Sequence, residues 1–206
     1  MTRRGKVFLV DDEPELRRAL ERLLRAEGLD VVGYGSAAEF LAALSDDDVG
    51  CAVLDVAMPG LDGLQLQQRL ASSRARLAIV FLTGHGDIPM SVQAVKAGAV
   101  DFLTKPVRSA DLLRAVHAAL EQAGAQQSMA QATAGLRSRY EQLTPREREV
   151  FGHVIAGRLN KVIAARLGTS EQTVKVHRGR VMEKLGVGSV ADLVRAAQQL
   201  GVEPAP

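Results

Sequence analysis

The sequence predicts two domains of different class: an α/β domain with a doubly wound parallel sheet, followed by a small all-α domain. Five short apolar runs alternate with helical patterns over about 120 residues, as in parallel sheets with helices on both faces. A stretch rich in Ala, Gln, Ser and Gly follows, and four further helical patterns lie beyond it. Residues 1–121 hold 14 Lys and Arg against 17 Asp and Glu, whereas residues 137–206 hold 12 against 7. This change in the sign of the net charge also favours two domains with different partners.

The composition is that of an ordinary globular protein, with 47% hydrophobic and 24% charged residues among 206. No apolar run approaches the roughly 18 residues of a membrane span. The start of the chain runs straight into a strand-like segment, so we expect no signal peptide. The single cysteine, Cys51, excludes a disulfide framework. We therefore expect a cytoplasmic protein with no membrane partner.

The first domain is expected to span residues 1–121. Its five apolar runs predict strands at 6–10, 31–34, 51–55, 78–82 and 101–103. Helical spacing predicts helices at 14–26, 37–44, 62–71, about 89–97 and from about 109 onward. Gly28 would end the first of these helices, and Ser36 would cap the second.

Residues 122–136 are expected to form the linker, because no apolar stripe there is wide enough to bury. The linker could extend the preceding helix, since Ala and Gln favour helix. The second domain, 137–206, reads as helices at 145–156, 160–167, 171–185 and 190–200. Thr144 followed by Glu147 predicts a capping box at the start of the first of them. The basic charge of this domain indicates a surface that could meet nucleic acid.

Carboxylates follow two of the predicted strands directly. Asp11 and Asp12 end the first strand and Asp55 ends the third. Most acids at strand ends only cap helices or form turns, which is the plain alternative. Parallel neighbouring strands end on the same edge of a sheet, however, so the three carboxylates would crowd one place. Like charges that close need compensation, and a divalent cation with oxygen ligands, Mg²⁺, would supply it.

Two further polar side chains end strands at this edge. Thr83 ends the fourth strand and Lys105 follows the fifth. A hydroxyl and an ammonium group are suited to hold phosphoryl oxygens. Together with the carboxylates they predict a phosphoryl-transfer site in which Asp55 is the acceptor.

Residues 1–121 resemble the receiver domain of two-component response regulators. The resemblance rests on Val-Asp-Asp-Glu at 10–13, Leu-Asp-Val-Ala-Met-Pro-Gly-Leu-Asp-Gly at 54–63, Leu-Thr-Gly-His-Gly-Asp at 82–87 and Gly-Ala-Val-Asp-Phe-Leu-Thr-Lys-Pro at 98–106. The third stretch is similar to the FixJ subfamily. The resemblance implies a five-stranded sheet in the order 2-1-3-4-5. A chemotaxis receiver is a known example of a doubly wound fold with this strand order.

The resemblance also implies a role for each site residue. Asp55 would be the phosphoacceptor, and Lys105, whose bond to Pro106 is typically cis in the family, would pair with a phosphoryl oxygen. The metal would be held by Asp11, Asp12, Asp55 and the backbone carbonyl of Ala57. Thr83 would bind the phosphoryl group once it is present, and Phe102 matches the aromatic residue that turns inward in the active state. An ordinary sheet residue facing a helix remains an equal interpretation of Phe102.

The second domain carries a helix–turn–helix spacing over residues 160–185, with a break at Gly168 and a cap at Ser170. Val174, Val181 and Leu185 fall on the side that would pack inward. A helical bundle with a solvated basic face, or a protein-binding domain, would also fit this pattern.

Residues 143 to about 200 resemble the LuxR-type output domain of FixJ and NarL relatives. The resemblance rests on Leu-Thr-Pro-Arg-Glu-Arg-Glu-Val, Asn-Lys-Val-Ile-Ala, Thr-Val-Lys-Val-His and a downstream Lys-Leu-Gly. It implies base contacts from Lys175 and Val176, and phosphate contacts from Thr173, Lys161 and Arg178. Lys184 adds charge suited to phosphates. Some relatives have a base-reading lysine at the place of Gly179, which leaves the base specificity of this chain open. The helix at 190–200 would be the dimer surface of this domain.

These features together indicate a transcription regulator rather than an enzyme. A sensor histidine kinase would phosphorylate Asp55, and the resulting homodimer would bind promoter DNA and act on RNA polymerase. A phosphoaspartate phosphatase of the haloacid dehalogenase type is disfavoured, because it would need a second acid where this chain has Ala57. A flavin or nucleotide carrier is disfavoured as well, because it would need a phosphate-cradling loop where this chain has Asp11 and Asp12.

Overall fold

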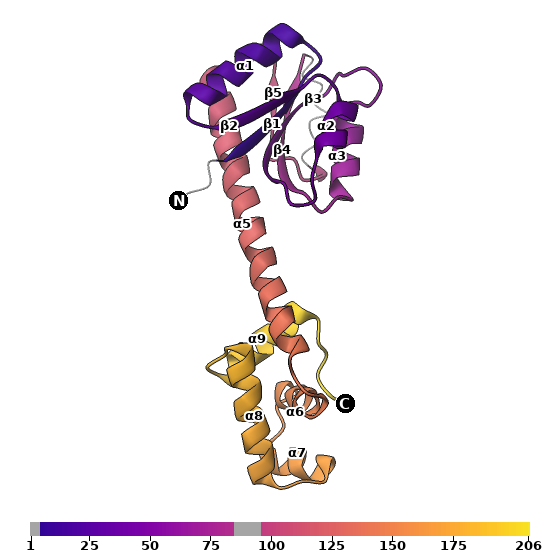
Figure 1. The fold of residues 1–206 in the computed structure, drawn as a ribbon, viewed down its shortest axis with the longest axis vertical. Coiled ribbons are helices and arrows are strands. Elements are labelled where there is room, and N and C mark those ends of the chain that lie inside the picture. Colours follow the sequence, from indigo (N-terminus) through magenta and orange to yellow (C-terminus); the bar gives the residue numbers. More distant parts are fainter. Residues whose placement is uncertain (1–4, 85–95) are drawn as a thin grey trace. The chain divides into compact units, whose positions relative to one another are not determined.

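The computed structural model describes residues 5–84 and 96–206, which divide into two compact units, Met1–Ser128 and Met129–Pro206. In the first unit the described elements are β1 (Lys6–Val10), α1 (Pro14–Ala26), β2 (Asp30–Tyr34), α2 (Ala37–Ala43), β3 (Val49–Asp55), α3 (Gly63–Ala71), β4 (Arg76–Thr83), β5 (Asp101–Thr104) and the start of α5 (Ser109–Glu141) (Figure 1). The helix expected at about 89–97 falls almost entirely outside the described residues. The expected alternation of strands and helices is confirmed for the rest of this unit.

The described strands form one parallel sheet in the order β2-β1-β3-β4-β5, as the resemblance implied. The three central strands, β1, β3 and β4, are buried along most of their length, which explains why their sequences are nearly continuous apolar runs. Helices α1 and α5 cover one face of the sheet, and α2 and α3 cover the other (Figure 1). Strand β3 is the central strand, so its last residue, Asp55, lies at the centre of the carboxyl edge of the sheet.

Two of the predicted helix caps are confirmed. The Ser36 hydroxyl accepts a hydrogen bond from the Glu39 backbone at the start of α2. The Thr144 hydroxyl accepts the backbone N–H of Glu147, whose carboxylate in turn accepts the backbone N–H of Thr144. These reciprocal bonds fix where the helix that starts at Pro145 begins.

The predicted linker is helical throughout. Helix α5 runs from Ser109 to Glu141, so it includes residues 122–136 and extends beyond the expected start of the second domain at 137. The second unit continues with α6 (Pro145–Ile155), α7 (Asn160–Leu167), α8 (Glu171–Leu185) and α9 (Val190–Leu200). Of all the helices within the described ranges, none has both the length and the apolar composition that crossing a membrane requires.

Candidate phosphoacceptor site and nucleic-acid interface

The register of the sheet brings the three acids together at its carboxyl edge. Val10 of β1 pairs with Leu54 of β3, so Asp11 and Asp55, the residues that follow, are neighbours. One carboxylate oxygen from each of Asp11, Asp12 and Asp55 lies within 4.8 Å of the others. Asp11 is fully buried and Asp55 is 3% exposed, whereas Asp12 is half-buried. The site is therefore a small acidic pocket that opens to solvent on the side of Asp12.

Lys105 enters this pocket from the end of β5. Thr83 pairs with Thr104 in the sheet, and the backbone N–H of Lys105 donates to the Thr83 carbonyl at 2.7 Å. The ammonium nitrogen of Lys105 lies 2.8 Å from a carboxylate oxygen of Asp11 and 2.8 Å from one of Asp55. The peptide bond between Lys105 and Pro106 is cis. A cation from β5 thus reaches acids that end β1 and β3.

A fourth carboxylate, which the sequence did not predict, lies at this site. Glu13 lies 3.1 Å from the ammonium nitrogen of Lys105, and its side chain is 63% exposed. The run Asp11-Asp12-Glu13 does contain this acid. An acid at the start of a helix commonly stabilises the positive end of the helix dipole, however, so Glu13 gave no reason to expect a role in the site.

The charges of the pocket do not balance. Burial raises the pKa of Asp11, although the ion pair with Lys105 opposes that rise. Burial alone would lower the pKa of Lys105, but its contacts with the carboxylates of Asp11, Asp55 and Glu13 outweigh that effect and raise it. Lys105 therefore stays charged and faces several carboxylates with a single positive charge. The donor set is entirely hard oxygen, which fits Mg²⁺.

Ala57 lies in the loop that follows β3. Its backbone N–H donates to a carboxylate oxygen of Asp55 at 3.2 Å, so the loop folds back over the acid. The side chain of Ala57 is exposed, and Gly63 at the start of α3 donates its backbone N–H to Val56 at 3.0 Å. A Cβ on Gly63 would lie 2.4 Å from the Asp55 carbonyl oxygen, which explains the glycine there. The loop is thus held against the pocket at both ends.

The two residues expected to act as a switch lie on β4 and β5. Thr83 is 3% exposed and follows Leu82, the partner of Asp55 in the sheet. Phe102 is half-buried, and its ring centroid lies 6.0 Å from that of Phe81. Phe102 packs against the core cluster under α2 and α3. The structure therefore places both residues as expected, while their switching roles stay predictions.

The second unit, Met129–Pro206, which we call the output unit, contains the expected helix–turn–helix. Helix α7 ends at Gly168, whose φ of +61° is the left-handed conformation that glycine adopts most readily. The Ser170 hydroxyl accepts the backbone N–H of Thr173 at 3.1 Å and so begins α8. Val174, Val181 and Leu185 are buried, as the helical spacing predicted. The opposite face of α8 remains available for a ligand.

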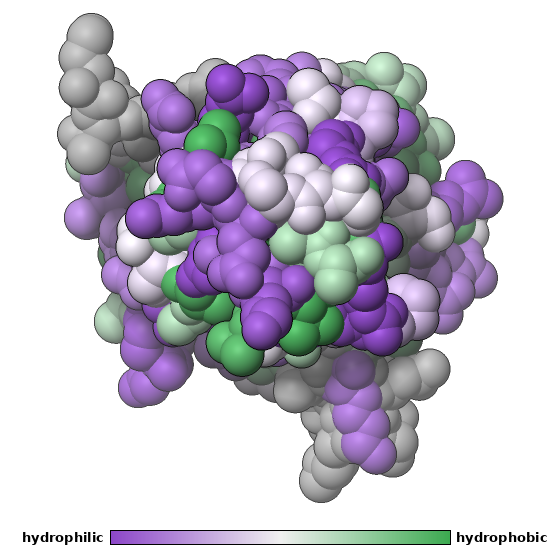
Figure 2. Space-filling view, turned by 90° about the horizontal axis from the view of Figure 1, so that it is seen from below, coloured by the Kyte–Doolittle hydropathy of each residue, from purple (hydrophilic) through white to green (hydrophobic). Residues whose placement is uncertain are grey.

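Three of the residues expected to contact DNA are on the outer surface of this unit. Lys161 and Lys175 are exposed, and Val176 is 44% exposed. The face shown in Figure 2 is mainly hydrophilic, with a few hydrophobic side chains among the polar ones. A surface of this kind suits phosphate contacts combined with a small number of base contacts.

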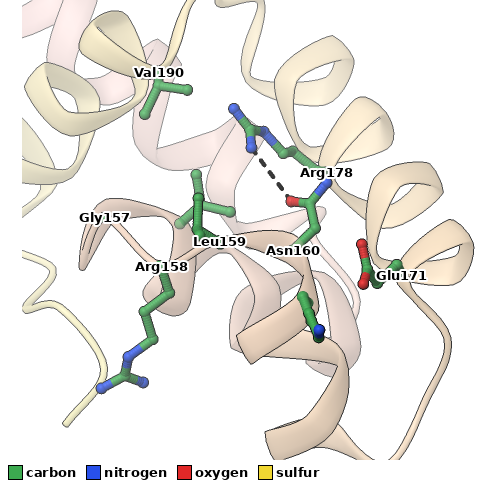
Figure 3. Close-up of a pocket in the computed structure, with 9 residues that line it drawn as sticks. Gly157, Arg158, Leu159, Asn160, Glu171, Arg178 and Val190 are labelled. Carbon is green, nitrogen blue, oxygen red and sulfur yellow. Dashed lines mark hydrogen bonds between the residues drawn. The ribbon is translucent and has the colours of Figure 1, made fainter.

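Two further expected DNA contacts have partners inside the unit. The Arg178 guanidinium donates a long hydrogen bond of 3.4 Å to the side-chain oxygen of Asn160 (Figure 3). This bond joins α8 to the first turn of α7 beside a shallow hollow, which Arg158 and Lys161 also line. The Thr173 hydroxyl lies 2.8 Å from that of Ser170. The side chains of Arg178 and Thr173 are half-buried.

Lys184 is not brought together with the other expected DNA contacts. Its ammonium nitrogen lies 2.7 Å from the Glu147 carboxylate and donates to the Gln142 carbonyl at 3.2 Å. Glu147 is 2% exposed and is the acid of the capping box at the start of α6. These contacts favour a role for Lys184 inside the unit rather than on a phosphate.

The Glu147–Lys184 pair predicts a pH-dependent stability. Burial alone would raise the pKa of Glu147, but hydrogen bonds from Lys184 and Thr144 outweigh that effect and hold the pKa below its usual value. The folded pKa lies below the unfolded one, so this stabilisation is full above the unfolded pKa and lost as the pH falls through the folded one. We expect Glu147→Gln to cost about 1–2 kcal/mol of unfolding free energy at neutral pH, because Lys184 loses its partner. The cost should shrink as the pH falls far enough to protonate Glu147 in the folded chain.

Urea denaturation followed by tyrosine fluorescence measures this effect. The sequence has two tyrosines and no tryptophan, so Tyr140 reports on the output unit alone in a Tyr34→Phe background. Glu149→Gln is the matched control, since Glu149 is 52% exposed and pairs with Arg146 on the same helix. Equal costs for the two glutamine variants at neutral pH would contradict the assignment.

Comparison with known proteins agrees with both halves of the chain. The family model of the response regulator receiver domain matches residues 7–117, and that of the bacterial regulatory proteins of the luxR family matches residues 141–197. Nodulation protein W of Bradyrhizobium diazoefficiens is 48% identical over 95% of this chain and 86% of its own length. The response regulator protein TodT of Pseudomonas putida is 44% identical over 96% of this chain and 87% of its own length.

Solved structures agree as well. The low-resolution structure of the response regulator StyR has a TM-score of 0.83 at 41% identity, covering 96% of this chain and all of that one. Full-length FixJ from B. japonicum has a TM-score of 0.59 at 38% identity, covering 97% of this chain and 98% of that one. The chain therefore belongs to the response regulators that join a receiver domain to a LuxR-type output domain.

Proposed function

We propose that this chain is a transcription regulator that phosphorylation of Asp55 switches on. The observation that carries the proposal is the convergence of Asp11, Asp12, Asp55 and Lys105 at one sheet edge, in a chain whose other unit is a helix–turn–helix. The phosphodonor is a sensor histidine kinase. The regulator would act in the cytoplasm, where a bacterial chromosome lies.

The chemistry is the transfer of a phosphoryl group to a carboxylate. A carboxylate oxygen of Asp55 attacks the phosphorus of the donor, the bond from phosphorus to the donor nitrogen breaks, and the imidazole leaves. Lys105 would bind a phosphoryl oxygen in place of its present contact with Asp55. Asp11, Asp12, Asp55 and the Ala57 carbonyl would hold Mg²⁺, which would offset the charge of the transferred group.

The phosphoryl group then changes the surface of the receiver. It adds about −1.5 to −2 charges and strong acceptor oxygens next to Thr83. The Thr83 hydroxyl would turn toward these oxygens, and Phe102 would fill the space that it leaves. The surface changed in this way includes β5 and would form the contact of a homodimer. Analytical ultracentrifugation tests the dimer, because a phosphorylated chain that stays monomeric at high concentration would rule it out.

The output unit would bind promoter DNA as the dimer and act on RNA polymerase. Helix α8 would enter the major groove with Lys175 and Val176 toward the bases. Lys161, Thr173 and Arg178 would contact phosphates. Helix α9 would form the dimer contact of this unit. Its residues Leu193, Ala196 and Ala197 are buried in the core of the unit, so the contact would use the other side of the helix.

Two lysine variants test the DNA contacts. The probe is a duplex that the phosphorylated wild type enriches from a random pool. We expect Lys175→Ala to cost about 1–3 kcal/mol on this duplex and to tolerate base changes that the wild type rejects. Lys161→Ala should weaken binding to all duplexes alike and reduce the slope of log affinity against log salt by about one. Fluorescence anisotropy over a range of salt concentrations measures both effects.

Arg74→Ala is the control for these variants, since it removes a positive charge from an exposed position in the receiver unit. Its affinity and salt slope should match those of the wild type. If Lys175→Ala and Arg74→Ala bound the selected duplex equally well, α8 would not be the reading helix. If the phosphorylated wild type enriched no duplex at all, the proposed function would be wrong.

A further inference from the structure

The carboxyl end of the recognition helix α8 is held by residues that precede the helix–turn–helix. The last carbonyls of a helix have no partner within it. Here the backbone N–H groups of Gly186 and Val187 satisfy carbonyls of the last turn, at Glu183 and Met182. The Leu185 carbonyl accepts a hydrogen bond of 2.9 Å from the Arg139 guanidinium instead. Arg139 also brings a positive charge to the negative end of the helix dipole.

Arg139 comes from the last turn of α5, and this turn belongs to the core of the output unit. Leu136 is 7% exposed and lies in the same core cluster as Leu185. The rings of Tyr140 and Phe151 meet edge to face with 5.5 Å between centroids. The backbone under Arg139 is therefore held in place on both sides of that residue.

Glycine at position 186 leaves room for this contact. A Cβ there would lie 2.7 Å from a guanidinium nitrogen of Arg139, so any other residue would push the guanidinium away. The φ of Gly186 is +68°, which is strained for other residues in any case.

A second tie joins the same end of α8 to the turn between α5 and α6. Lys184 binds the Gln142 carbonyl and the Glu147 carboxylate. The last two residues of α8 are thus anchored on both sides of this turn. The residues expected to read bases, Lys175 and Val176, lie about 15 Å away along the helix at 1.5 Å per residue.

We propose that Arg139 is a positioning residue for DNA recognition. It acts through the Leu185 carbonyl and keeps α8 at the angle at which Lys175 and Val176 meet the bases. Without the Arg139 side chain, α8 would adopt that angle in only a fraction of the molecules. The affinity for DNA would be reduced in proportion to that fraction. This inference rests on the proposed function, because it presupposes that α8 reads DNA.

The test uses the full chain, phosphorylated, with R139M, R139K and R137M. Arg137 is an exposed arginine on the same helix and serves as the matched control. The probes are the duplex that the wild type selects and a scrambled duplex of equal length. We expect R139M to bind the selected duplex roughly fivefold more weakly, as expected for the loss of one charge-assisted hydrogen bond. Its affinity for the scrambled duplex and its salt slope should not change, and R139K should recover most of the loss.

A residue that supported only the stability of the unit would weaken binding to both duplexes together. Equal affinities of R139M and R137M for the selected duplex would overturn the proposal. A parallel loss on both duplexes with a smaller salt slope would also overturn it, since Arg139 would then be a phosphate contact. R139Q replaces R139M if the latter does not fold, with the same expectations. Failure of the wild type to select any duplex would instead refute the proposed function itself.

Discussion

The Asp55→Asn chain is expected to take up no phosphoryl group from acetyl phosphate in the presence of Mg²⁺. The wild type should gain one group, which intact-mass spectrometry detects directly. The reason is chemical, because an amide oxygen cannot replace the carboxylate as the attacking nucleophile. The fold should be kept, since the substitution preserves the shape of a residue that is 3% exposed. The expected loss is therefore complete and specific to one side chain.

Asp30→Asn is the matched control for this experiment. Asp30 is an exposed acid at the start of the edge strand β2, at the opposite end of the sheet from the acidic pocket. It should be phosphorylated to the same extent as the wild type. Equal uptake by Asp55→Asn and the wild type would show that another residue is the acceptor.

Removal of Mg²⁺ should have the second large effect. Chelation with EDTA is expected to stop phosphoryl uptake by the wild type, because the acidic pocket holds too little positive charge to accept another anion. Mg²⁺ should also stabilise the folded chain by about 2.7 kcal/mol at a hundred times its dissociation constant. Asp12→Asn should lose both effects, and differential scanning calorimetry with and without Mg²⁺ measures the stabilisation.

The acidic loop at 46–48 provides the control for the metal site. It also has three consecutive acids. Among the described residues, however, only Asp11, Asp12 and Asp55 place their carboxylate oxygens close enough together to hold a metal ion. Asp47→Asn should therefore respond to Mg²⁺ like the wild type. The magnesium site would be disproved if Asp12→Asn were stabilised by Mg²⁺ as much as the wild type.

Most of the acidic pocket could be predicted from the sequence because Asp11 and Asp55 directly follow apolar runs, whereas Glu13 could not be told from an ordinary helix-start acid. Strand β3 is buried along nearly its whole length, so the change from Leu54 to Asp55 marks the sheet edge clearly. Parallel pairing then places Asp11 beside Asp55 without further information. Lys105 follows β5 in the same way. Local pattern and one topological rule were sufficient there.

Contacts between distant segments could not be predicted in this way. Lys184 reads as an outward-facing cation on α8, and its partner Glu147 lies 37 residues earlier in the chain. The helical pattern also does not show where α5 ends, because Ala and Gln favour helix without marking a boundary. The tie between Arg139 and Leu185 spans 46 residues and joins a side chain to a carbonyl. Backbone carbonyls leave no trace in the amino-acid pattern.

The most direct test of the whole account is the affinity of one chain for one duplex before and after phosphorylation. Fluorescence anisotropy follows the wild type on its selected duplex, with Mg²⁺ present and acetyl phosphate added during the measurement. We predict that affinity rises after the addition, and that the rise is absent in Asp55→Asn and in EDTA. The same affinity before and after full phosphorylation, confirmed by mass on the same sample, would contradict it. The receiver would then not control the output unit through Asp55.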